Sequence, residues 1–321
     1  MIYIMAIGGL ALLLAGGDLL VRGVISLSAN IGISPLLMGL IIVGFGTSAP
    51  EMIISIQAAV SGAPGVALGN VVGSNIANVL LVLGAPALIS PIAFDRAGLK
   101  RHILVMLGVS LIFAALALGG VFGLREGVLL LALVAGFLCY SVRDHRREVP
   151  PVLDMLKTDV ALGGIAGRTH SSLFAGAMVA GGMAGLILGA HLLVDGAVAA
   201  ARMLGVGEDV IGLSMIAFGT SLPELASTIA AAYRRHADIA LGNVIGSNIF
   251  NILAVMGVTA AIAPVPVPQR FLALDIWVML AAAVMLLFFA VTRRSIGRGA
   301  GAAFLLAYAL YMIWLFRLGG V

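Results

Sequence analysis

The chain has 321 residues, of which 62% are apolar and only 10% are charged, and its mean hydropathy is +1.18. A soluble domain is usually about 45–50% apolar and about 25% charged, so this composition excludes a soluble globular protein and a disordered chain. The small net charge of +4 argues against nucleic-acid binding, and the single Cys139 excludes an internal disulfide and a multi-cysteine metal cluster. We therefore expect a protein that crosses the lipid bilayer several times.

Apolar stretches recur along the whole chain. A spanning helix needs about 20 mostly apolar residues. Ten stretches meet this requirement: 2–21, 33–62, 66–91, 102–121, 125–142, 172–194, 206–233, 238–263, 271–292 and 299–318. The first has no basic residues before it and contains Asp18, which favours a retained helix over a cleaved signal peptide. Because the sequence lacks the alternation expected of β-barrel strands, we predict an all-α polytopic membrane protein with ten transmembrane helices.

The basic residues in the loops predict the orientation of the chain. Fourteen Lys and Arg residues fall in loops on the side opposite the N-terminus, and four fall on the same side: Arg125, Arg202, Arg270 and Arg317. Since cytoplasmic loops are enriched in basic residues, both termini are expected outside. The polar segment 143–170 is then a cytoplasmic linker, a solvated loop between two halves at 1–142 and 171–321.

The two halves share motifs at a fixed offset of 173 residues. Residues 44–51, Gly-Phe-Gly-Thr-Ser-Ala-Pro-Glu, match residues 217–224 at six of eight positions. Residues 69–78, Gly-Asn-Val-Val-Gly-Ser-Asn-Ile-Ala-Asn, match residues 242–251 at eight of ten. Because each half holds five predicted helices, an odd number, the second half enters the membrane from the opposite face. This pattern indicates two inverted five-helix repeats, an arrangement that many secondary transporters use.

Two carboxylates, Glu51 and Glu224, are the only ones expected deep within the spans, and they occupy equivalent positions. A charge at the bilayer centre is costly, so such residues usually mark an ion site or a proton path. Each follows a proline, which removes a helical hydrogen bond and crowds the carbonyl four residues earlier. We therefore predict that helices 2 and 7 are broken near the membrane centre. The carbonyls made available as ligands belong to Gly44, Gly46, Thr47, Ala217, Gly219 and Thr220.

Other oxygen-bearing side chains recur four residues apart, which places them on one face of each helix. The rows are Thr47, Glu51 and Ser55; Thr220, Glu224 and Thr228; Asn70, Ser74 and Asn78; and Asn243, Ser247 and Asn251. All of these are hard oxygen donors, which suit Ca²⁺ and Na⁺ rather than zinc or copper.

Several polar residues also have a structural interpretation. Asn70 and Asn243 are placed to cap helices, and hydrogen bonds between helices are as good an account of Asn75 and Asn248 as ion contact. Asp18 with Arg22, and His191 with Asp195, are expected as pairs or exposed charges near helix ends.

The duplicated motifs resemble the two repeats of the cation/Ca²⁺ exchanger superfamily, the sodium/calcium exchangers and their prokaryotic relatives. The resemblance covers nearly the whole chain. It implies that Glu51 and Glu224 ligate Ca²⁺ with the carbonyls of Thr47 and Thr220, and that Asn78 and Asn251 close the centre. The implied sodium ligands are Thr47, Ser48, Ser74, Thr220, Ser221, Ser247 and carbonyls near Gly44 and Ala217. Many relatives carry Asp where this chain has Asn251, which leaves the number of Na⁺ ions and coupling to K⁺ or H⁺ open.

The function expected from the sequence is that of a secondary antiporter, not an enzyme, which exports Ca²⁺ in exchange for Na⁺ by alternating access. The transported ions are the expected partners, no cofactor is expected, and a prokaryotic inner membrane is the expected location. A Ca²⁺/H⁺ antiporter on the same scaffold is the nearest alternative, and a passive cation channel is a remote one that the inverted repeat argues against. The oligomeric state stays open.

Overall fold

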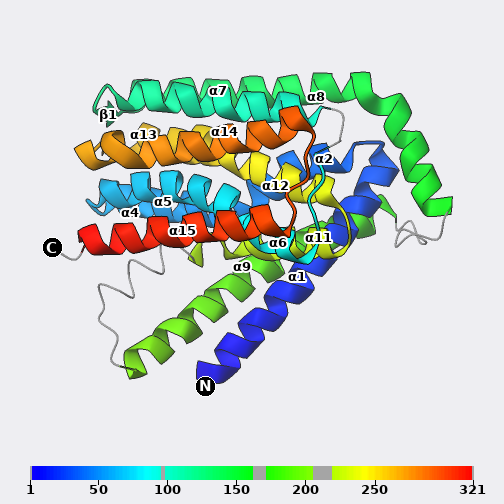
Figure 1. Ribbon diagram of the computed structural model, residues 1–321, viewed down its shortest axis with the longest axis horizontal. Helices are drawn as coiled ribbons and strands as arrows, with labels where there is room; N and C mark the ends of the chain where they lie inside the picture. Colours follow the sequence, from blue (N-terminus) through cyan, green and yellow to red (C-terminus); the bar gives the residue numbers. More distant parts are fainter. Residues whose placement is uncertain (1, 95–97, 162–170, 205–218, 320–321) are drawn as a thin grey trace.

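The structure, a computed structural model, describes residues 2–94, 98–161, 171–204 and 219–319. These residues are almost entirely helical, which confirms the predicted all-α membrane fold (Figure 1). Strands β1 (Val121–Phe122) and β2 (Val265–Pro266) form a short antiparallel ribbon at one end of the helices. At the other end, Ile92 and Ile296 exchange backbone hydrogen bonds of 3.0 and 2.9 Å.

The first repeat contains five predicted spans, and each is helical. Helix α1 (Ile2–Ile31) is followed by a second span made of α2 (Pro35–Met38), η1 (Gly39–Val43), α3 (Gly44–Thr47) and α4 (Ala49–Val60). The third span is built from α5 (Pro64–Ala77), η2 (Asn78–Val82) and α6 (Gly84–Ile89). The last two are α7 (Leu99–Ala117) and α8 (Leu124–Ala161). The η segments are π-helical.

The second repeat follows the same order. It contains α9 (Ser172–Met203), α11 (Leu222–Tyr233), α12 (Ala237–Phe250), η3 (Asn251–Val255), α13 (Met256–Ile262), η4 (Phe271–Asp275), α14 (Ile276–Thr292) and α15 (Arg298–Gly319). Within the described ranges, nine helical spans are long and apolar enough to cross a membrane. The first half of the predicted span 206–233 lies outside the described residues, and α11 is its second half.

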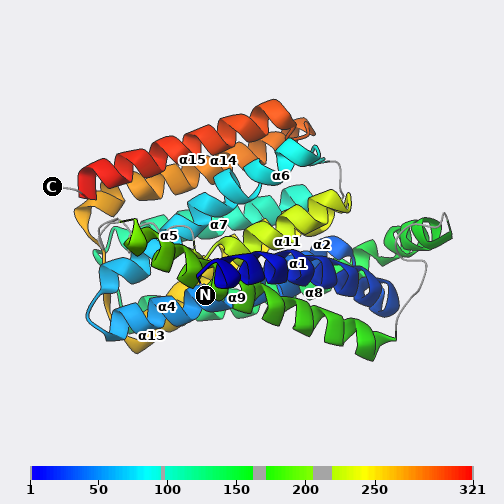
Figure 2. The same ribbon diagram turned by 90° about the horizontal axis from the view of Figure 1, so that it is seen from below.

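Helices α1 and α9 pack against each other in antiparallel directions through glycines (Figures 1 and 2). A Cβ atom on Gly9 would lie 2.4 Å from the backbone nitrogen of Leu193, and one on Gly182, its equivalent in the repeat, would lie 2.6 Å from that of Leu20. Such close backbone approach is typical of glycine-lined contacts between membrane helices. The pair is inclined to the other spans in Figure 1.

The centre of the molecule is formed by the third span and its counterpart, α12 with η3 and α13. Their apolar side chains, such as Leu68, Ile76, Val244 and Ile252, are fully buried in the main hydrophobic core. Two of the four oxygen-rich rows, those of Asn70 and Asn243, lie on these central helices, so the fold places these polar residues inside the protein and away from lipid.

The predicted linker 143–170 differs from the expectation of a loop. Helix α8 continues without interruption to Ala161, and it bends in its C-terminal part (Figure 1). Many residues of this segment have good helix propensity, which explains the continuation. Pro150 and Pro151 lie within it, and proline is a common cause of a helix bend.

Candidate functional site

The second span is interrupted at Ser48. Helix α3 ends at Thr47 and α4 begins at Ala49, and between them Ser48 has φ −81° and ψ 2°. Helix α11 starts in the same way, since its preceding residue Ser221 has φ −84° and ψ 2°. In both cases a proline occupies the first turn, where its missing N–H is tolerated. The predicted break in helix 2 is therefore confirmed, and the described part of helix 7 has the matching geometry.

Glu51 and Glu224 lie in the first turns of α4 and α11, and both side chains are fully buried. None of their four carboxylate oxygens has a hydrogen-bond partner among the described residues. The positive end of a helix dipole stabilises a carboxylate by at most about 2 kcal/mol, far less than the cost of burying an unpaired charge. These oxygens therefore suit cations as their missing partners.

Asn70 connects the first break to the opposite repeat. Its Nδ2 donates to the backbone carbonyl of Glu51 at 3.0 Å and to Ser55 Oγ at 2.9 Å. Its Oδ1 accepts a hydrogen bond from Thr220 Oγ1 at 3.4 Å. Asn70 lies in the middle of α5, so its interpretation as a helix cap is wrong.

Asn243 makes the equivalent contacts in the second repeat. Its Nδ2 donates to Thr228 Oγ1 at 3.0 Å and to the carbonyl of Glu224 at 3.4 Å, and its Oδ1 accepts from Thr47 Oγ1 at 3.2 Å. It also lies within a helix and is not a cap. Each asparagine therefore holds the backbone of one buried glutamate and contacts a threonine from the other broken helix, which brings the two motifs together.

Hydroxyl groups surround the first break. Thr47 Oγ1 lies 3.3 Å from Ser247 Oγ, which donates to the carbonyl of Gly44 at 3.3 Å. The hydroxyls of Ser48 and Ser221 are buried, and neither has a hydrogen-bond partner in the described part of the chain. The structure thus places predicted sodium ligands from both repeats in one cluster, whereas Ala217 lies outside the described residues.

Asn78 and Asn251 are fully buried and begin the π-helical segments η2 and η3. Asn78 Nδ2 donates to Asn248 Oδ1 at 3.1 Å, a contact between the repeats, whereas Asn75 donates to the backbone of its own helix at 2.7 Å. The remaining side-chain oxygen of Asn78 and both polar atoms of Asn251 have no partner among the described residues. A π-helical turn inside an α-helix often marks a functional site.

Two cavities adjoin these residues. One of about 300 Å³ is lined by Pro50, Thr220 and Pro223 from the broken helices and by His191 and Asp195 from α9. Both residues are exposed, as expected, but they lie within α9 rather than near its end, and the His191 ring nitrogen Nδ1 lies 3.0 Å from the carbonyl oxygen of Ile187.

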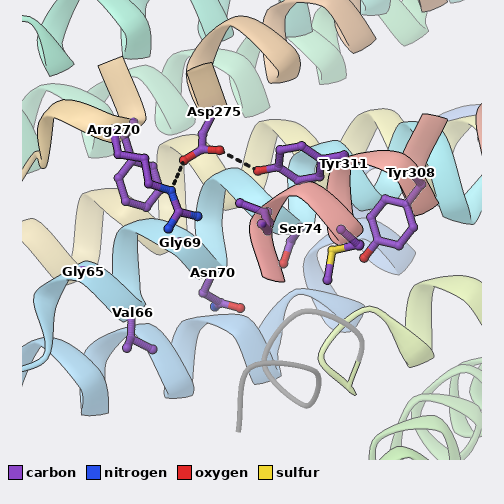
Figure 3. Close-up of a pocket in the computed structure, with 13 residues that line it drawn as sticks. Gly65, Val66, Gly69, Asn70, Ser74, Arg270, Asp275, Tyr308 and Tyr311 are labelled. Atoms are coloured by element: carbon purple, nitrogen blue, oxygen red, sulfur yellow. Dashed lines mark hydrogen bonds and ion pairs between the residues drawn. The ribbon is translucent and has the colours of Figure 1, made fainter. Parts of the chain in front are cut away.

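The other cavity has a volume of about 250 Å³. It reaches Asn70 and Ser74, and Asp275 lines its opposite wall (Figure 3). Asp275 is 1% exposed, so Glu51 and Glu224 are not the only buried carboxylates, although Asp275 lies near the start of its span rather than deep within it. The signal was present in the sequence, since an aspartate lies inside the predicted span 271–292.

Asp18 also differs from the sequence-based expectation. It pairs with Arg22 at 2.9 Å as predicted, but it additionally accepts a 2.6 Å hydrogen bond from Arg234 Nε at the end of α11. Asp18 therefore links α1 to the second broken helix.

Comparison with known proteins identifies the family. A family model described as sodium/calcium exchanger protein matches residues 1–143 and 174–317. The chain is 31% identical over 343 residues to the sodium/calcium exchanger MaX1 of Methanosarcina acetivorans, covering 98% of each chain. It is 34% identical over 311 residues to the inner membrane protein YrbG of Escherichia coli, covering 96% of this chain and 93% of the relative.

A solved structure also matches. The sodium-calcium exchanger NCX_Mj, soaked with Na⁺ and Ca²⁺, aligns with a TM-score of 0.82 and 34% identity over 96% of both chains. The family model and these full-length relatives agree with the duplicated motifs and the helical fold. The chain therefore belongs to the sodium/calcium exchanger family.

Proposed function

We propose that the protein is a secondary antiporter that exchanges Na⁺ for Ca²⁺ by alternating access at a site between its two repeats. The observation that carries this proposal is the pair of fully buried glutamates, Glu51 and Glu224, whose oxygens have no hydrogen-bond partner among the described residues. The proposal is supported by the name of MaX1 and by the Na⁺ and Ca²⁺ soak of NCX_Mj.

The chemistry of exchange follows from charge balance. Two ionised glutamates carry two negative charges, which one Ca²⁺ cancels and which Na⁺ ions can cancel separately. Ca²⁺ takes six to eight oxygen ligands, more than two carboxylates supply, so backbone carbonyls and neutral side chains must complete the shell. Because the two kinds of ion share ligands and balance the same two negative charges, they exclude each other, and this competition couples the two fluxes.

The proposed ligand sets for Ca²⁺ and Na⁺ overlap at Thr47 and Thr220 and otherwise differ. Glu51 and Glu224 with the carbonyls of Thr47 and Thr220 bind Ca²⁺, and Asn78 and Asn251 close the centre. Na⁺ binds among the hydroxyls and carbonyls of the two breaks and the central helices. These sodium ligands are Thr47, Ser48, Ser74, Thr220, Ser221, Ser247, Gly44 and Ala217.

Alternating access is proposed to use the inverted repeats. The α1–α9 pair packs through glycines and forms a separate layer beside the broken helices, so its displacement would open one face while closing the other. An empty site would leave two unpaired carboxylates in a low dielectric, which makes movement without ions costly. From the basic residues, we place residues 143–170 in the cytoplasm and both termini outside, in a prokaryotic inner membrane.

The experiment is ⁴⁵Ca²⁺ flux in proteoliposomes with Na⁺, K⁺ and H⁺ gradients imposed separately. We expect uphill Ca²⁺ movement driven by a Na⁺ gradient, and its loss in Glu51→Gln and in Glu224→Gln. Flux that ignores Na⁺ and follows a pH gradient would replace the proposal with Ca²⁺/H⁺ exchange. Flux that runs only downhill without a counter-ion would indicate a channel, and substantial transport by either glutamine variant would refute the site.

A further inference from the structure

A third buried carboxylate, Asp275, lies outside the proposed central site. It ends the π-helical segment η4, at the end of α14 that carries the β1–β2 ribbon. In the described chain, η1 directly precedes Gly44, and η2 and η3 begin at Asn78 and Asn251. Three of the π segments thus adjoin the proposed ion site. Since π segments often mark functional sites, the fourth, which ends at Asp275, is a candidate for a further site.

The two oxygens of Asp275 have different surroundings. Tyr311 of α15 donates a hydrogen bond from its hydroxyl to Oδ1 at 2.9 Å, which fixes the carboxylate (Figure 3). The other oxygen, Oδ2, has no hydrogen-bond partner among the described residues, and Arg270 Nε lies 3.5 Å away at ion-pair distance. The Arg270 side chain is 45% exposed whereas Asp275 is 1% exposed, so the arginine can leave toward water and the carboxylate cannot.

Asp275 faces a cavity of about 250 Å³ that leads toward the central site. The cavity is lined by Arg270 and Gly65 near the ribbon end and by Asn70 and Ser74 toward the centre of α5. A row of glycines on α5 helps to leave this space: a Cβ atom on Gly73 would meet nothing within 4 Å in the described part of the protein.

In the other repeat the equivalent glycine lies against η1, whereas the residue equivalent to Leu40 that would adjoin Gly73, Leu213, lies outside the described residues. A Cβ on Gly246, the counterpart of Gly73, would lie 2.0 Å from the carbonyl oxygen of Leu40. The position equivalent to Asp275, 173 residues earlier, holds His102 rather than a carboxylate. A buried aspartate at this position is therefore a property of one face, the face that the basic residues predict to be extracellular.

We propose that Asp275 is an outer subsite for an alkali cation, Na⁺ under the proposed function on which this inference rests, and that Arg270 occupies the subsite when no ion is bound. A single carboxylate cancels one positive charge, so Na⁺ leaves the buried site neutral whereas Ca²⁺ would leave an excess charge in a low dielectric. The oxygen of the Tyr311 hydroxyl and water would complete an oxygen shell.

The subsite makes predictions of opposite sign for its two charged members. Asp275→Asn keeps the size of the side chain and an acceptor for Tyr311, but loses the charge. It should raise the Na⁺ concentration for half-maximal Ca²⁺ exchange roughly tenfold, as expected when a charged ligand is lost. Arg270→Gln removes the competing cation and should lower that concentration. Asp238→Asn is the matched control, because Asp238 is a buried aspartate near the start of a helix on the other face.

A second measurement separates this inference from the proposed function. In the Glu51→Gln, Glu224→Gln double variant, replacing choline by Na⁺ should still raise the melting temperature, because ligand binding stabilises the folded state. Adding Asp275→Asn should abolish that rise. The subsite is refuted if Asp275→Asn leaves both readouts unchanged, or if Arg270→Gln shifts the Na⁺ requirement in the same direction as Asp275→Asn. Absence of Na⁺-driven exchange in the unmodified protein would refute the proposed function alone. The effect of Na⁺ on the melting temperature would still test whether Asp275 binds Na⁺.

Discussion

Replacing Asn70 with alanine tests whether contacts between the repeats position the buried carboxylates. Asn70 donates to the carbonyl of Glu51 at 3.0 Å and to Ser55 Oγ at 2.9 Å, and it accepts from Thr220 at 3.4 Å. The substitution removes all three hydrogen bonds at a position that is 2% exposed. The Glu51 backbone then loses its tie to the central helix.

The expected loss follows from the two shorter bonds, since the 3.4 Å contact to Thr220 is weak. A buried group left without its partner costs about 1–3 kcal/mol, so two such groups give about 2–4 kcal/mol of unfolding free energy after some relaxation. If about 1.4 kcal/mol of this reaches the ion-bound state through a displaced Glu51, the half-saturating Ca²⁺ concentration rises about tenfold.

Asn75→Ala is the matched control, because Asn75 is equally buried on the same helix but donates at 2.7 Å to the backbone of Val71. The measurements are thermal unfolding of purified protein and the Ca²⁺ dependence of ⁴⁵Ca²⁺ flux in proteoliposomes. We expect Asn70→Ala to lower both stability and apparent Ca²⁺ affinity, and Asn75→Ala to leave the affinity near that of the unmodified protein. Equal Ca²⁺ affinity in the two variants would show that the hydrogen bonds of Asn70 do not position Glu51.

Three further predictions concern the repeat symmetry. Gly246→Ala should destabilise the protein strongly, because the added methyl group would meet a backbone carbonyl at 2.0 Å; the yield of folded protein and its melting temperature test this. Asp18→Asn should cost no more than about 1 kcal/mol, since Asp18 is 41% exposed, and the exchange Asp18→Arg with Arg234→Asp should recover part of the lost melting temperature. Asn251→Asp adds a carboxylate at the centre and should increase the charge moved per Ca²⁺, measured as current against ⁴⁵Ca²⁺ flux.

Features set by local chemistry could be predicted from the sequence. A proline one residue before Glu51 leads directly to the interruption at Ser48, because the ring cannot take part in a continuous helix. Burial of Glu51 and Glu224 follows from their position within apolar spans combined with a polar motif. The roles of these residues as ion ligands stay a prediction, since they depend on ions that only a binding or flux measurement tests.

Features that depend on contacts between distant segments could not be predicted in the same way. Asn70 looks like a cap in the sequence because it follows the turn at Gly62–Ala63 closely, and only the packing of α5 against the second repeat reveals its contact with Thr220. Asp275 lies near the end of its span, where an aspartate usually reaches water. Its burial depends on Tyr311, which comes from the next helix.

Deviations from exact symmetry give the transporter two unequal faces. Asp18 joins α1 to α11 through Arg234, but the positions offset by 173 residues hold His191 and Ser61, which cannot form the same ion pair. On that side a cavity of about 300 Å³ separates α9 from Pro50 instead. An inverted repeat with identical halves would make the two access states equal in energy. Under the proposed alternating access, a charged contact made in only one of the two access states would bias the equilibrium toward that state, and ions that bind to the other state would have to supply the free energy to reverse it.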